Sequence, residues 1–103
     1  MIAGLTQQQI NVIIGEVLNI PEIERVAVFG SRAMGNQKPG SDVDLAIWGK
    51  NIDHSQAIAL SIRLNQYTNL PYKFDVVTFD RITEPELKKH IEEFGMVIYN
   101  STV

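Results

Sequence analysis

The chain contains no cysteine, which excludes disulfides and metal sites built from thiolates. It also lacks an apolar run of about eighteen residues, the length that a transmembrane helix requires. The N-terminal residues Met1–Leu5 have no basic head of the kind that opens a signal peptide. We therefore expect no membrane span and a cytoplasmic location.

Positive charge is scarce as well. The nine basic residues are scattered, the net charge is −3 and the isoelectric point is near 5.2. A nucleic-acid partner is not expected, because neutralising a phosphate backbone normally requires a basic face. Neither G-x-x-x-x-G-K-[ST] nor G-x-G-x-x-G occurs, so the P-loop and Rossmann modes of nucleotide recognition are excluded.

Length and periodicity predict one layered domain over residues 1–103. With 103 residues and 45% hydrophobic content, the chain can bury one modest core. Strands alternate with helices, which indicates an α+β (α/β layered) fold with a mixed sheet of about four strands covered by helices. Expected strands are about Arg25–Phe29, Val43–Trp48, Tyr72–Phe79 and Met96–Tyr99, and expected helices are about Thr6–Asn19, His54–Tyr67 and residues 83–95.

Two aspartates one residue apart, Asp42 and Asp44, are the most informative feature of the chain. Side chains alternate between the faces of a strand, so these two project together while Val43 and Leu45 face the other way. Like charges this close raise each other's pKa unless a cation lies between them. A turn after Pro39 would account for Asp42 alone, but it leaves Asp44 unexplained.

Asp75 repeats the anomaly, as a charge among the β-branched and aromatic residues of a predicted strand. We expect it to join Asp42 and Asp44 in one divalent-metal site, since carboxylate oxygens are the ligands that hard cations prefer. Two Mg²⁺ ions are expected, and Mn²⁺ accepts the same oxygen ligands.

Gly30 and Ser31 follow the strand Arg25–Phe29 and are expected to open a short helix at residues 32–35. Such a turn presents free backbone amides that favour phosphate oxygens. Gly30 permits close approach, Ser31 offers its hydroxyl, and the adjacent Arg32 is a candidate triphosphate clamp. A glycine turn with a serine cap would account for Gly30 and Ser31 alone, so the phosphate hypothesis depends on their position relative to the aspartates.

These motifs together resemble the minimal nucleotidyltransferases of the DNA polymerase beta-like nucleotidyltransferase superfamily. That family carries a Gly-Ser, a spacer of about ten residues, an Asp-x-Asp and a third acid on a later strand. In this sequence the matching residues are Gly30, Ser31, Asp42, Asp44 and Asp75. The resemblance covers most of the chain and implies the small nucleotidyltransferase fold.

The resemblance also implies a function. ATP, or another nucleoside triphosphate, would donate a nucleoside monophosphate to a hydroxyl acceptor. The acceptor would be a helical HEPN partner protein, and the chain would act as the antitoxin of a toxin–antitoxin pair. Two alternatives stay open: a module that binds metal-nucleotide and masks its partner without catalysis, and a transferase that modifies a small molecule. Self-association could also supply a wall for the acceptor pocket, for which the sequence shows no residues.

Other chemically capable residues are expected to have structural roles. His54 is expected near the start of a helix as a solvated cap. His90 is grouped with Lys88 and Lys89 on a solvated cationic face. Trp48, at a strand end, is expected in the core or at its rim.

Overall fold

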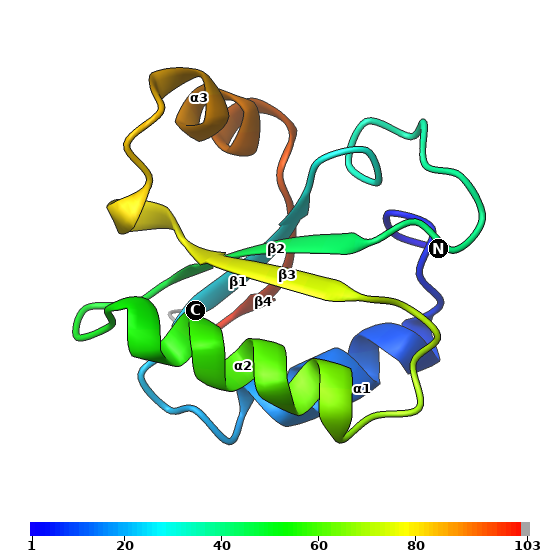
Figure 1. Cartoon of the computed structure of the whole chain (residues 1–103), viewed down its shortest axis with the longest axis horizontal. Helices are drawn as coiled ribbons and strands as arrows, with labels where there is room; N and C mark the ends of the chain where they lie inside the picture. The colour runs from blue at the N-terminus through cyan, green and yellow to red at the C-terminus, as the bar shows by residue number, and fades with distance from the viewer. Residues whose placement is uncertain (102–103) are drawn as a thin grey trace.

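The computed structural model describes residues 1–101. Its elements follow the predicted alternation of strands and helices (Figure 1). In chain order they are α1 (Gln7–Val17), β1 (Arg25–Phe29), β2 (Val43–Trp48), α2 (His54–Gln66), β3 (Phe74–Thr78), the 3₁₀ turn η1 (Phe79–Arg81), α3 (Pro85–Phe94) and β4 (Met96–Asn100).

The four strands form one mixed sheet in the order β3-β2-β1-β4. The central strand β1 is antiparallel to both β2 and β4, whereas β2 and β3 run parallel and are connected through α2. This confirms the predicted α+β class with a mixed four-stranded sheet. The structure sets narrower limits for the third strand, because Phe79 begins the 3₁₀ turn.

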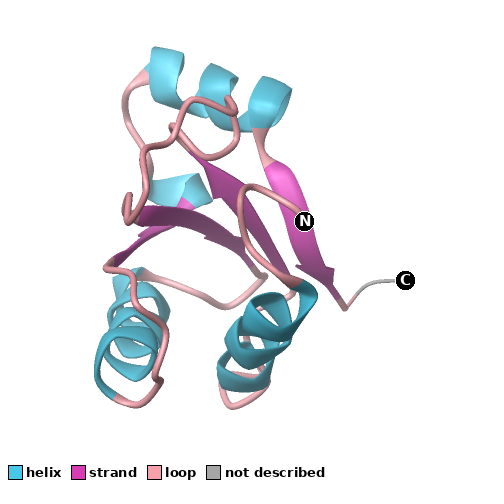
Figure 2. Cartoon of the chain, turned by 90° about the vertical axis from the view of Figure 1, so that its right-hand side faces the viewer, coloured by secondary structure: helices cyan, strands magenta, loops and turns pink. Residues whose placement is uncertain are grey.

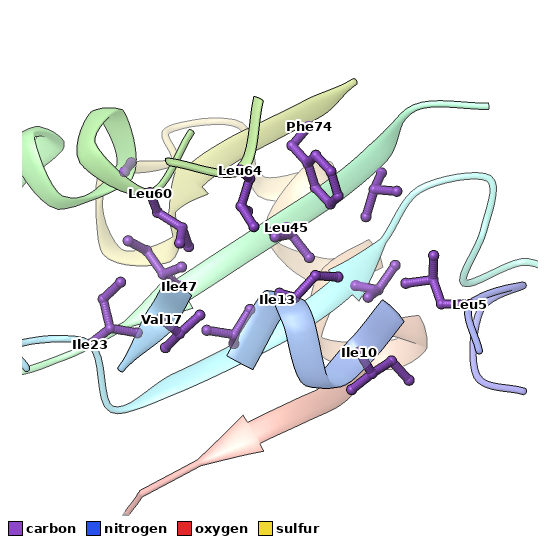
Figure 3. Packing of buried hydrophobic residues seen from close by; sticks show 14 of the residues in the cluster. Leu5, Ile10, Ile13, Val17, Ile23, Leu45, Ile47, Leu60, Leu64 and Phe74 are labelled. Atoms are coloured by element: carbon purple, nitrogen blue, oxygen red, sulfur yellow. The ribbon is translucent and has the colours of Figure 1, made fainter. Parts of the chain in front are cut away.

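Helices cover the two faces of the sheet unequally. Figure 2 shows α1 and α2 on one face and α3 alone on the other. The main core lies under α1 and α2, where Val43 of β2 is fully buried. Leu45 and Ile47 of the same strand are also fully buried there (Figure 3). A smaller cluster lies under α3 and centres on Phe29, Ala46 and Ile91. Alternate residues of β2 therefore face different layers, as the strand periodicity predicts.

The helix ends explain how the sequence sets these layers. A reciprocal capping box between Thr6 and Gln9 starts α1, and another between Asp53 and Gln56 starts α2. In α3, Glu84 takes the N-cap position without a side-chain hydrogen bond, and Pro85 occupies the first turn. Gly95 is the C-cap of α3.

The longest helix in the described part of the chain is α2, with 13 residues. None of the helices in residues 1–101 combines the length and apolar character needed to cross a bilayer.

Candidate active site

Asp44 and Asp75 lie opposite each other at the start of the parallel strands β2 and β3. Their Cα atoms are register partners, and adjacent strands are about 4.8 Å apart. Asp44 is on the face that carries Ala46, and Asp75 is on the face that carries Val77; both of these residues pack in the cluster under α3. Asp42, two residues before Asp44, belongs to the same face. The structure thus brings the three predicted carboxylates to one end of the α3 face.

The electrostatics of Asp44 show the proximity of the other two acids. Burial raises the pKa of Asp44 above its ordinary value of 3.8, and the negative charges of Asp75 and Asp42 raise it further. His90 acts in the opposite direction. Asp44 is half-buried, whereas Asp42 and Asp75 are exposed. A cation at this position would remove the repulsion that raises the pKa.

The residues fit a divalent cation by donor chemistry and by charge. Within residues 1–101 the ion pairs are Arg63–Glu16 and Lys89–Glu93, so none of the three aspartates forms a salt bridge in this part of the chain. Carboxylate oxygens suit Mg²⁺ and Mn²⁺. In the described chain no three acidic or histidine side chains are already close enough to hold an ion. Binding would therefore require side-chain rotation, which the exposure of Asp42 and Asp75 permits.

Gly30 follows β1 directly and packs against Asp44. Its φ of +76° lies in the left-handed region, and a Cβ at this position would overlap the carboxylate oxygen Oδ2 of Asp44. Glycine is therefore required by both the backbone and the space. The Gly30 carbonyl accepts from the amides of Ala33 (3.1 Å) and Met34 (3.2 Å), which closes the turn. The short helix expected at residues 32–35 is wrong, because these residues form only a turn.

Ser31 sits at the exposed apex of this turn. In the described part of the chain its N–H and hydroxyl make no hydrogen bond that would compete with a ligand. The Gly30 N–H differs, because it donates to Nε2 of His90 at 2.9 Å. The amide of Ser31 is thus available to a phosphate, whereas that of Gly30 is engaged.

His90 is the site residue that the sequence interpretation missed. It is half-buried and contacts the rings of Phe29 and Phe94, so the expected solvated cationic face is wrong for this residue. The helical spacing could have revealed this position. His90 is three residues after Leu87 and four before Phe94, which places it on the apolar side of α3. Lys89 is exposed, as expected for that face.

The guanidinium of Arg32 is engaged inside the fold. Its side chain is only 4% exposed, and the guanidinium lies over the ring of Tyr72 at 4.5 Å. It donates to the carbonyls of Ala3 (3.0 Å), Ser41 (2.9 Å) and Asp42 (3.3 Å). The interpretation of Arg32 as a triphosphate clamp is therefore corrected: it fastens the two ends of the loop between β1 and β2 and so positions Asp42.

Comparison with known proteins identifies the family of the chain. The family model described as polymerase beta, nucleotidyltransferase matches residues 11–102. Two Methanocaldococcus jannaschii proteins, each named as a candidate protein adenylyltransferase, are 37% and 36% identical to the chain over 76 residues. Each match covers 70% of this chain and 72% of the relative. The chain belongs to the polymerase beta nucleotidyltransferase family.

Solved structures share the fold of this nucleotidyltransferase. A chain of a toxin–antitoxin complex with AMP-PNP superposes with a TM-score of 0.72 at 23% identity, covering 90% of this chain and 74% of that one. A chain of the MntA–HepT toxin–antitoxin gives 0.68 at 22% identity, covering 92% and 73%. A candidate nucleotidyltransferase from Sulfolobus solfataricus gives 0.54 at 17% identity, covering 88% and 76%. These likenesses confirm the expected nucleotidyltransferase fold.

Arg32→Lys is expected to destabilise the nucleotidyltransferase by about 2–4 kcal/mol. A lysine ammonium cannot reach the carbonyls of Ala3, Ser41 and Asp42 together, so buried acceptors lose their donors. Urea unfolding measures the effect, with Arg81→Lys as the control because Arg81 is exposed. Equal unfolding midpoints for the Arg32 variant and the wild type would show that the loop does not depend on the guanidinium.

The remaining candidates have structural roles. Trp48 stacks on Phe79 with ring centroids 5.0 Å apart, and the guanidinium of Arg25 covers it at 4.0 Å. This confirms Trp48 as a residue at the rim of the core. His54 is exposed at the start of α2, as expected, but its expected capping role is wrong: the cap of that helix is Asp53, which accepts from the Ser55 amide at 2.7 Å.

Proposed function

We propose that this nucleotidyltransferase transfers AMP from ATP to a hydroxyl of a partner protein, with divalent cations bound by Asp42, Asp44 and Asp75. The observation that carries the proposal is the pairing of Asp44 with Asp75 in the sheet, directly beside the Gly30–Ser31 turn. Carboxylates without a salt bridge beside an amide without a protein acceptor suit a metal-bound triphosphate.

The residues have distinct tasks in this reaction. Asp42 and Asp44 hold the cations, and Ser31 uses its hydroxyl and amide to position the terminal phosphates. The cations, when bound, polarise the α-phosphate and neutralise the leaving pyrophosphate. Asp75 completes the metal site and accepts the proton of the acceptor hydroxyl. A bond forms between the acceptor oxygen and the α-phosphorus, and the bond to pyrophosphate breaks.

The protein acceptor is supported by the relatives. Those in Methanocaldococcus jannaschii are named for protein adenylyltransfer, and structural neighbours come from toxin–antitoxin complexes. We propose a HEPN-type toxin as the acceptor and an antitoxin role for this chain. Because Asp75 is exposed, a docked partner can bring its hydroxyl directly to this carboxylate.

Neutralisation by masking is the second candidate function. It is favoured by one observation, namely that no ready-made three-ligand metal site exists among the described residues. In that case the chain would cover its partner without transferring AMP. The two functions differ in the covalent state of the partner.

Intact-mass measurement separates them and tests the role of metal. The HEPN partner is incubated with the chain, ATP and Mg²⁺, and in parallel with EDTA, with Mn²⁺ added back, and with the Asp44→Asn variant. We expect whole AMP units on the partner with either cation, and none with EDTA or the variant, because hard carboxylate sites require a divalent ion. A tightly bound partner that stays unmodified with ATP and Mg²⁺ would establish masking instead.

A further inference from the structure

The imidazole of His90 lies between α3 and the turn that follows β1. Its Nε2 accepts the Gly30 N–H at 2.9 Å. The ring makes an edge contact with Phe29, with ring centroids 6.2 Å apart, and lies 5.6 Å from that of Phe94. These aromatic contacts restrict the orientation of the imidazole, so the acceptor is presented to Gly30 from a fixed direction.

Gly30 is therefore held at two points. Its Cα packs against the carboxylate of Asp44, where no side chain could fit, and its N–H is held by His90. A glycine at positive φ has a wide choice of conformations when nothing restrains it. Its two contacts fix the distance between the turn that carries Ser31 and the carboxylate that is proposed to bind metal.

We infer that His90 is a positioning residue for the nucleotide. It sets the Gly30–Ser31 turn relative to Asp44, so that Ser31 and the metal-binding carboxylates contact the same triphosphate. The inference rests on the proposed function for the identity of the ligand. Its chemical basis is pre-organisation: a turn already in place costs less conformational entropy when it binds phosphate.

Three substitutions of His90 test whether the position of the hydrogen-bond acceptor matters, as distinct from the polarity and the packing of the side chain. His90→Gln places an amide oxygen near the position of Nε2, His90→Asn carries the same group on a shorter side chain, and His90→Leu has no acceptor. The control is Lys89→Gln, on the exposed side of the same helix. Unfolding free energies of all four variants identify any loss of fold.

The expected readout is a change in KM for ATP and in the Kd for AMP-PNP with Mg²⁺. We expect His90→Leu and His90→Asn to raise both by roughly tenfold, the size of one well-placed hydrogen bond, with kcat within about threefold of wild type. His90→Gln should restore values close to wild type, and Lys89→Gln should leave them unchanged. If Asn and Gln behave alike, or if Leu binds AMP-PNP as tightly as wild type, the inference is overturned.

Hydrogen exchange of the Gly30 amide provides a test without catalysis. This amide should be protected in the wild type and in His90→Gln, and should exchange faster in His90→Leu and His90→Asn. AMP-PNP affinity and exchange can be measured even if the wild type transfers no AMP. Absence of AMP transfer in the wild type would thus refute the proposed reaction. Equal exchange of the Gly30 amide in the wild type and the three His90 variants would refute the role of His90.

Discussion

Asp44→Asn is expected to lower AMP transfer by about 10³-fold or more while the fold is retained. The substitution keeps the size of the side chain but removes the negative charge that lies between those of Asp42 and Asp75. Carboxylate ligation of a divalent cation contributes several kcal/mol to the transition state, and an amide oxygen replaces it poorly. Initial rates with ATP and Mg²⁺, followed by radiolabelled AMP on the partner, measure the loss.

The same substitution is expected to stabilise the metal-free protein at neutral pH. Burial and the charges of Asp75 and Asp42 raise the pKa of Asp44 above 3.8, its ordinary value. Between the ordinary and the raised pKa, the folded state binds more protons than the unfolded state, so stability falls as the pH rises through that window. Asparagine does not titrate. The free energy of unfolding of Asp44→Asn should therefore exceed that of the wild type above that window, and this difference should vanish below pH 3.8.

Asp80→Asn is the matched control for both effects. Asp80 is exposed in the 3₁₀ turn Phe79–Arg81, and its loss should change neither transfer nor the pH dependence of urea unfolding.

Mg²⁺ with AMP-PNP should raise the melting temperature of the wild type more than that of Asp44→Asn. An Asp44→Asn protein that transfers AMP at the native rate would refute the metal-ligand role of Asp44.

The strands and the acidic pattern could be predicted from sequence because both depend on short-range periodicity. The bounds of β1 and β2 match the prediction, since alternation of side chains along a strand follows from the backbone alone. That alternation also predicted the shared face of Asp42 and Asp44. The exact pairing of Asp44 with Asp75 depends on the register of β2 with β3, which sequence spacing does not determine.

The roles of Arg32 and His90 could not be predicted from the local sequence. Both contacts join segments distant in sequence: Arg32 bonds to Ala3, 29 residues away, and His90 accepts from Gly30, 60 residues away. An arginine beside a glycine-serine turn has the same local pattern whether its side chain points outward or into the fold. Only tertiary packing, which closes the loop over Tyr72 and lays α3 on the sheet, decides between these roles.

Gly30→Ala is expected to reduce AMP transfer by about 10²-fold and to lower the unfolding free energy by about 1–2 kcal/mol or more. Two physical effects combine. The φ of +76° is unfavourable for alanine, and the new Cβ would overlap Oδ2 of Asp44. Either the carboxylate or the turn must move, so Ser31 and the proposed metal ligands would no longer reach the same triphosphate.

Gly35→Ala separates these two effects. Gly35 has the same φ of +76°, but in the described residues no atom other than those of Gly35 itself and its two chain neighbours lies within 4 Å of the position that its Cβ would occupy. We therefore expect Gly35→Ala to cost a similar backbone strain, measured by urea unfolding, and to retain near-native transfer at temperatures where it is folded. Equal losses of activity in the two variants would mean that backbone strain, and not displacement of Asp44, causes the defect. A clear difference between them would place the carboxylate of Asp44 and the Gly30 turn in one functional unit.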